Sequence, residues 1–182
     1  MKNNKRSKLL FGIIMTAFIM AGVSFATNYV PKDWVLPNKA ITPGLLNNDV
    51  NQNNIKDNIC KTGWTTTIRP TVNYTNKLKL DQLKGDYKYL TANFSTDASK
   101  YEEDHLISLQ LGGNPSDPKN LWPQPYEGNN ARKKDVVETK LKKMVCSGTL
   151  KLADAQKMIA TDWAGAYKKY ALKDTEINSE DN

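Results

Sequence analysis

The first 26 residues constrain the rest of the chain most, because they have the pattern of an export signal. An apolar run begins at Leu9 and ends in the small-x-small cleavage site Ser24-Phe25-Ala26, and it follows the basic residues Lys2, Lys5, Arg6 and Lys8. We therefore expect a signal peptide over 1–26, export to the periplasm or the medium, and no stable membrane association after cleavage. The alternative is a retained anchor, although the run to Ala26 falls short of the ~20 apolar residues that usually cross a bilayer.

The composition suits a single globular domain with a small extension. The 182 residues are 39% hydrophobic and 25% charged, which is typical of neither a disordered nor a polytopic chain. Removing the four signal cations lowers the formal net charge from +7 to +3. That mildly basic balance fits a phosphate-bearing partner. One histidine and two cysteines exclude zinc sites built from four cysteines or from two cysteines and two histidines.

The two cysteines, Cys60 and Cys146, lie far apart in the chain, and neither has a second cysteine or a histidine at metal-ligand spacing. In an oxidising compartment a disulfide is the simplest outcome. Closing so long a loop contributes about 4–5 kcal/mol on the chain-entropy account. Two buried free thiols are the alternative.

Helical periodicity is strongest in the C-terminal part of the chain. One apolar stripe, ended by Gly148, is formed by Val137, Leu141, Met144 and Val145, and a second helix carries Leu152, Ala155, Ile159, Trp163 and Tyr167 on one face. Residues 173–182 hold four acids and one large apolar residue, which predicts a disordered acidic tail.

The segments before these helices give weaker signals. Residues 27–98 are expected to form an N-terminal extension that packs on the core. Its predicted parts are an arm over 27–58 with a short helix near Asn51–Ile59, a strand at Trp64–Arg69 and a helix at Tyr74–Leu83. Alternation over Leu106–Leu111, followed by Gly112-Gly113, predicts a further strand closed by a tight turn. The fold class is therefore α+β.

The run Glu102-Glu103-Asp104-His105 carries the clearest chemical signal. Three carboxylates beside the single imidazole repel one another unless a cation lies among them. A divalent ion bound by Asp104 would relieve that repulsion and leave His105 beside it as a general base. Glu102 lies on the same strand face as Asp104 if the strand is regular. It would then be a carboxylate behind the metal ligand, without contacting the metal itself; the alternative is a solvent-exposed acid. Regular alternation sends Asp104 and His105 to opposite faces, so the strand must end, twist or bulge there.

Amide and basic side chains follow at the start of the strong helix. Asn120 and Asn130 offer the oxygen ligands that a hard cation such as Mg²⁺ requires. Arg132, Lys133 and Lys134 lie in the first turns, where a helix N-terminus already favours anions. The sequence therefore predicts a phosphate held between the Asp104-His105 pair and this helix.

The order Asp-His, Gly-Gly, Asn, and then Asn-x-x-Lys resembles the HNH nuclease family, the ββα-metal (His-Me finger) fold. The runs YEEDHLISLQLGG, NLWPQ, NARKKDVVE, VCSGTL and AQKMIATDW resemble a group of small exported bacterial proteins with an HNH-like nuclease domain. The upstream pieces TPG, IC-x-x-GW and RP-x-x-x-YT are similar to the same group. The likeness covers nearly the whole mature chain. Its core spans about 99–147, and the nuclease domain with its C-terminal helix spans 99–172.

The resemblance implies a set of roles and a reaction. Asp104 corresponds to the metal-binding Asp, His105 to the general base, Asn120 to the Asn that steadies the hairpin, and Asn130 to the last metal ligand. The family often has His where this chain has Asn130, which favours Mg²⁺, with Mn²⁺ as a second candidate, over zinc. The implied activity is an exported endonuclease that leaves 5′-phosphates. Its basic cluster predicts little sequence specificity, and DNA is favoured over RNA as the substrate, with RNA left open.

Two other functions stay open. An exported protein could keep the fold without the activity and bind nucleic acid or an acidic wall polymer through its basic helix. A wall hydrolase using Glu102 or Glu103 as its acid is a third reading, although no second carboxylate is paired with either. No feature of the sequence identifies an inhibitor protein.

Overall fold

The structure, a computed structural model, describes residues 34–172. The predicted signal peptide over 1–26, the start of the arm and the predicted acidic tail over 173–182 lie outside the described residues. Within 34–172, no helix combines the length and the apolar character needed to cross a bilayer.

The described residues form five α-helices and one two-stranded antiparallel sheet, which confirms the α+β class. The helices are α1 (Trp64–Ile68), α2 (Val72–Lys84), α3 (Lys88–Asn93), α4 (Asn130–Cys146) and α5 (Leu152–Tyr167), and the strands are β1 (Tyr101–His105) and β2 (Leu121–Pro125). The strand register runs from Tyr101 opposite Pro125 to His105 opposite Leu121. The order strand, strand, helix is therefore present in β1, β2 and α4.

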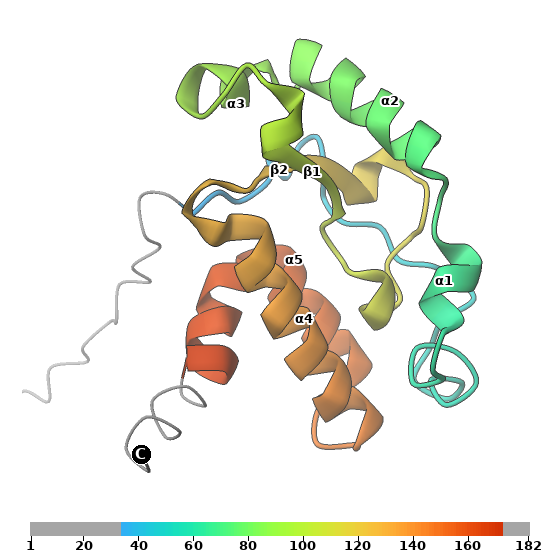
Figure 1. The fold of residues 1–182 in the computed structure, drawn as a ribbon. Helices are drawn as coiled ribbons and strands as arrows, with labels where there is room; N and C mark the ends of the chain where they lie inside the picture. Colours follow the sequence, from blue (N-terminus) through green and yellow to red (C-terminus); the bar gives the residue numbers. More distant parts are fainter. Residues whose placement is uncertain (1–33, 173–182) are drawn as a thin grey trace, which may run out of the picture.

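The hairpin lies between two layers of helices, with α2 and α3 on one side and α4 and α5 on the other (Figure 1). Each side has its own apolar core. Side chains of α2, α3 and the hairpin form the smaller one, namely Leu83, Tyr87, Leu90, Tyr101, Leu106 and Trp122. The larger core joins α4 and α5 to the N-terminal arm and includes Trp34, whose ring stacks on Trp163 with 5.3 Å between centroids.

Helices α4 and α5 follow the predicted periodicity. Val137, Leu141 and Val145 are fully buried on one side of α4, and Gly148 follows it with a φ of 79°, a conformation that glycine adopts without strain. On α5 the buried residues include Leu152, Ala155, Ile159 and Trp163. Both helices are thus held by apolar burial against each other.

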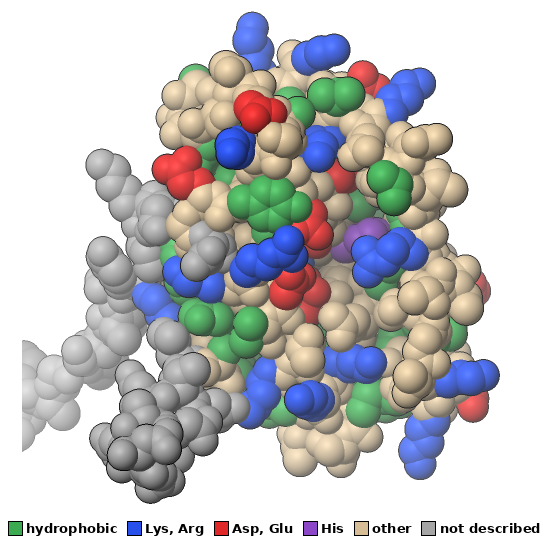
Figure 2. All heavy atoms as spheres, viewed as in Figure 1, with side chains coloured by type: hydrophobic (Ala, Val, Ile, Leu, Met, Phe, Trp, Pro, Cys, Tyr) green, Lys and Arg blue, Asp and Glu red, His purple; other side chains and the backbone are tan. Residues whose placement is uncertain are grey.

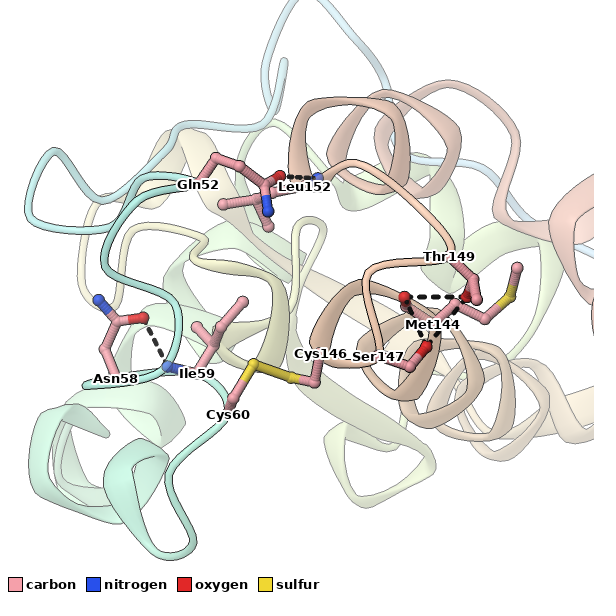
Figure 3. Close-up of a disulfide and its surroundings, with 9 residues drawn as sticks. All are labelled: Gln52, Asn58, Ile59, Cys60, Met144, Cys146, Ser147, Thr149 and Leu152. Carbon is pink, nitrogen blue, oxygen red and sulfur yellow. Dashed lines mark hydrogen bonds between the residues drawn. A yellow bond between two sulfur atoms is a disulfide. The ribbon is translucent and has the colours of Figure 1, made fainter.

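A disulfide joins Cys60 to Cys146, as predicted, and ties the segment before α1 to the last residue of α4 (Figure 3). The Cα atoms are 5.6 Å apart, within the usual range for a disulfide. Nearby, the Gln52 side chain accepts a hydrogen bond of 2.7 Å from the backbone N–H of Leu152, at the start of α5. The N-terminal segment is therefore fixed to the ends of both C-terminal helices.

Two predictions for the N-terminal segment are wrong. Trp64–Ile68 is a helix and not a strand, and the hydroxyls of Thr66 and Thr67 donate to the carbonyls three residues earlier, as threonine can do within a helical turn. The expected helix near Asn51–Ile59 is a succession of turns. Asparagine side chains accept the backbone N–H groups there, as Asn54 does for Asn51.

The expected strand at Leu106–Leu111 is also wrong. The strand lies directly before this segment, over Tyr101–His105, so its start is five residues earlier than predicted. Residues 106–120 form the connection to β2. Odd-numbered and even-numbered residues of the segment are both buried, including Leu106, Ile107, Leu109 and Leu111. Gly113 closes the segment against Ile107, since a Cβ at that position would lie 1.7 Å from the Ile107 carbonyl oxygen. The connection is thus packed on both sides, which a period-two pattern cannot distinguish from a half-buried strand.

Candidate functional site

The single histidine is the last residue of β1 and is almost completely buried, with 5% of its surface exposed. Its Nε2 lies 2.8 Å from the carbonyl oxygen of Pro115 in the connection to β2. A carbonyl can only accept a hydrogen bond, so Nε2 carries the ring proton and Nδ1 of the neutral ring is the basic atom. The local fold therefore selects one tautomer of His105.

Asn120 holds the connection that carries Pro115. Its Oδ1 accepts the Ile107 N–H at 2.9 Å, and its Nδ2 donates to the carbonyls of Ile107 and Asn114. Asn114 in turn accepts the N–H groups of Ser116 and Asp117. Asn120 is fully buried. It touches the backbone of the hairpin connection, and it positions His105 through Pro115.

Asp104 and His105 have different partners, although they are neighbours. Asp104 Oδ2 accepts a hydrogen bond of 2.7 Å from the Lys134 ammonium of α4, while the imidazole bonds to the connection. Lys134 also donates to the His105 carbonyl at 2.7 Å and to Glu138 one turn further along α4. One buried cation therefore joins the end of β1 to α4.

Electrostatics keep this cation charged. Burial alone would lower the pKa of Lys134, but the carboxylates of Asp104 and Glu138 outweigh it and hold that pKa above its ordinary value. Burial raises the pKa of Glu138, and Lys134 opposes this rise. With 1% of its side chain exposed, Lys134 neutralises buried acids and does not reach a phosphate in solvent, contrary to the expectation for this residue.

Burial is also the main influence on His105. It lowers the pKa of the imidazole, and the positive charges of Lys134 and Arg69 lower it further. The Pro115 hydrogen bond and Asp104 act in the opposite direction. The ring is therefore a neutral base at pH 7. Figure 2 shows the histidine, in purple, between acidic side chains and a basic one that lies against it.

Two further carboxylates of β1 surround Asp104. Glu102 lies 3.8 Å from Arg132, and burial together with Asp104 and Asp135 raises its pKa. Glu103 was not expected to matter for a metal or phosphate site, yet both its oxygens are buried without a hydrogen-bond partner. Burial and the Asp104 charge raise the pKa of Glu103 to about 9, so it holds its proton at neutral pH.

The other two predicted phosphate-binding cations are partly engaged. Arg132 is exposed, pairs with Asp135 at 3.2 Å, and places its guanidinium 5.3 Å from the centre of the Tyr126 ring. Lys133 donates to the Gly128 carbonyl at 3.0 Å and lies 4.6 Å from the centre of the Trp34 ring. The basic cluster of α4 therefore points in three directions, as expected for consecutive helical residues.

The two predicted metal ligands, Asp104 and Asn130, have different hydrogen-bond partners. Asn130 is fully buried, its Oδ1 accepts the Val35 N–H at 2.9 Å, and its Nδ2 donates to the Glu127 carbonyl, so it fixes the arm to the start of α4. Asp104 fits a divalent ion better, since its Oδ1 accepts no hydrogen bond from residues 34–172. Over the same range, no three His, Cys, Asp or Glu side chains lie close enough together to hold a metal.

No model of a protein family matches the chain, and neither the curated proteins nor the solved structures contain a match.

Proposed function

We propose that this protein is an exported, metal-dependent endonuclease that hydrolyses phosphodiester bonds in nucleic acid, DNA more readily than RNA, with little sequence specificity. On this proposal β1, β2 and α4 are a ββα-metal core within residues 99–172. The observation that carries the proposal is the single imidazole at the end of β1, whose Nε2–H is held by the Pro115 carbonyl and whose Nδ1 is left as a base. Products with a 5′-phosphate follow from the resemblance to HNH nucleases.

In the proposed reaction, His105 is the base, and Asn120 and Lys134 position it. His105 Nδ1 takes a proton from the attacking water as its oxygen forms a bond to phosphorus, and the bond to the 3′ oxygen breaks. The lowered pKa of His105 keeps the ring able to accept this proton at neutral pH. Asn120 positions His105 through the connection, and Lys134 fixes the backbone carbonyl of His105 to α4.

A divalent ion, Mg²⁺ or Mn²⁺, supplies Lewis-acid stabilisation of the phosphate when bound, and Asp104 is the residue proposed to hold it. Asn130 is not included among the proposed metal ligands, because both polar atoms of its amide are bonded to the backbone of the arm and of the turn before α4.

One observation favours a second function. The Lys134 ammonium already neutralises the Asp104 carboxylate that the metal would need. A cation supplied by the chain in this position suits an exported protein that keeps the fold and binds nucleic acid or an acidic polymer without cutting it.

Incubation of the protein with supercoiled plasmid, with Mg²⁺ or with EDTA, separates the two functions. Metal-dependent nicking is expected, and shifted but intact DNA would support the binding protein instead. His105→Ala is expected to lower the cleavage rate about 10²–10⁴-fold, the usual cost of losing a general base, while DNA is still bound. Asp104→Asn should instead raise the Mg²⁺ concentration needed for half-maximal rate. Near-normal cleavage by His105→Ala, or activity that survives EDTA, would contradict the proposed site.

A further inference from the structure

The junction between α1 and α2 is short and fixed at both ends. The Arg69 backbone N–H ends α1 with a hydrogen bond of 3.1 Å to the Thr65 carbonyl. Pro70 follows, and the Thr71 hydroxyl caps α2 by accepting the Tyr74 N–H at 3.3 Å. Because the junction contains a proline between two capped helices, the Arg69 backbone has little freedom to move.

This junction is attached to the connection that holds His105. The Tyr74 hydroxyl, in the first turn of α2, donates to the Ser116 carbonyl. The neighbouring carbonyl, that of Pro115, accepts the proton of His105 Nε2. The peptide that orients the imidazole is thus bonded on its next residue to α2. The run RP-x-x-x-YT in the sequence corresponds to these positions, from Arg69 to Thr75.

Arg69 is an exposed cation at this junction, five residues before the Tyr74 that is bonded to the connection. Its charge is one of those that act on His105. Within residues 34–172 the Arg69 guanidinium forms no ion pair and no side-chain hydrogen bond, whereas Arg132, Lys133 and Lys134 all have partners. Of these four cations, Arg69 is the one with its donors unused.

We propose that Arg69 binds the scissile phosphate beside His105, so that the N-terminal extension, and not the basic turn of α4, supplies the cation that stabilises the transition state. The proposal rests on the phosphodiesterase function proposed above. A planar guanidinium presents paired donors that match two non-bridging phosphate oxygens. Held by a fixed backbone next to the base, it would oppose the charge that develops when water attacks phosphorus. Tyr74 is then a positioning residue for the same site.

The test compares Arg69→Met with Arg69→Lys and with Lys84→Ala, which removes one exposed cation from the far end of α2. Plasmid nicking by Arg69→Met is expected to lose about 10²-fold in kcat, as for loss of one transition-state donor, with a smaller change in KM. Arg69→Lys should recover part of the rate, since it restores the charge without the paired donors. Lys84→Ala should stay within twofold of the wild type, and all three should melt near the wild-type temperature.

A second readout does not need cleavage. The chain has one histidine, so its ring gives a single NMR titration. Arg69→Met is expected to raise the pKa of His105, because a nearby positive charge is removed, and Lys84→Ala should leave it unchanged. A wild type that cuts while Arg69→Met cuts within twofold of Lys84→Ala would overturn the role of Arg69 and leave the nuclease intact. A wild type that cuts no nucleic acid with Mg²⁺ or Mn²⁺ would overturn the nuclease itself, whatever the His105 titration gives.

Discussion

Glu103 of β1 has a buried carboxyl group without a hydrogen-bond partner in residues 34–172, which is unfavourable for the stability of the fold. Both carboxylate oxygens are buried and accept no hydrogen bond. Desolvation is the largest influence on this group, the Asp104 charge adds to it, and Lys79 only partly opposes them. A carboxyl in such a place keeps its proton, because ionisation there would leave an unpaired buried charge.

Glu103→Gln tests this at the level of stability. The pKa of Glu103 is raised in the fold from 4.5 to about 9, so between these values the folded protein binds more protons than the unfolded chain. The free energy of unfolding therefore falls as pH rises through this window. Glutamine has nearly the same shape and does not titrate. At about 1.36 kcal/mol for each pH unit above 4.5, the variant should be more stable than the wild type at pH 8 by on the order of 5 kcal/mol, and at pH 4 about equal.

Urea unfolding at both pH values measures the difference. Glu127→Gln is a matched control, because Glu127 is exposed and precedes α4. A variant at Glu103 that gains nothing on going from pH 4 to pH 8, compared with this control, would contradict a protonated Glu103.

The sequence could identify the chemistry of individual residues better than their surroundings. Residue type and order single out Asp104, His105 and Asn120; His105 and Asn120 both bond to the connection to β2, whereas Asp104 bonds to Lys134 of α4. The roles of Asn130 and Lys134 depended on three-dimensional contacts. A signal for Lys134 did exist, since it precedes Val137 by three and Leu141 by seven positions and so lies on the apolar stripe of α4. Three consecutive basic residues look equivalent in a sequence until the helix face is considered.

At the scale of elements, periodic segments were predictable and short ones were not. The long apolar stripes gave α4 and α5 because burial along one face is what stabilises such helices. Trp64–Ile68 is too short for a periodicity, and its threonines favour strands only where a partner strand exists. The position of β1 was missed by five residues because its acids conceal the alternation between Tyr101 and His105, the two residues of the strand that are buried.

The link between β1 and α4 depends on Lys134, which is the one cation between two acids. Lys134→Met keeps the length of the side chain but leaves Asp104 and Glu138 to repel each other beside a buried carbonyl. Removing one partner from a buried ion pair costs about 3–5 kcal/mol, so the free energy of unfolding should fall by that amount. Denaturant unfolding at pH 7 measures it.

Lys133→Met is the matched control, one residue away on the same turn. Lys133 is partly exposed and its ammonium bonds to a single carbonyl, so its loss should cost about 1 kcal/mol. Equal losses for the two variants would mean that the Lys134 triad does not hold β1 to α4.

At the scale of the whole molecule, the N-terminal extension is part of the fold and not an appendage. Trp34 completes the larger core, α2 and α3 complete the smaller one, and Gln82 donates to the Leu121 carbonyl of β2 at 2.9 Å. The hairpin by itself would expose both faces. A pair of short strands of this kind needs helices on both sides for its stability, so residues 34–98 and 99–172 should unfold together.

The disulfide links the N-terminal extension covalently to the rest of the fold. It joins Cys60, nine residues before Arg69, to the end of α4, so its loss frees the extension at a point between the arm and the α1–α2 junction. Constraint of the unfolded chain by so long a loop predicts a loss of about 4–5 kcal/mol for the Cys60→Ala/Cys146→Ala variant. Urea unfolding with and without dithiothreitol measures this: the wild type should lose stability on reduction, whereas the double variant should not respond. If the wild type unfolds at the same urea concentration in both conditions, the disulfide does not stabilise the fold, and the extension is held by the two apolar cores alone.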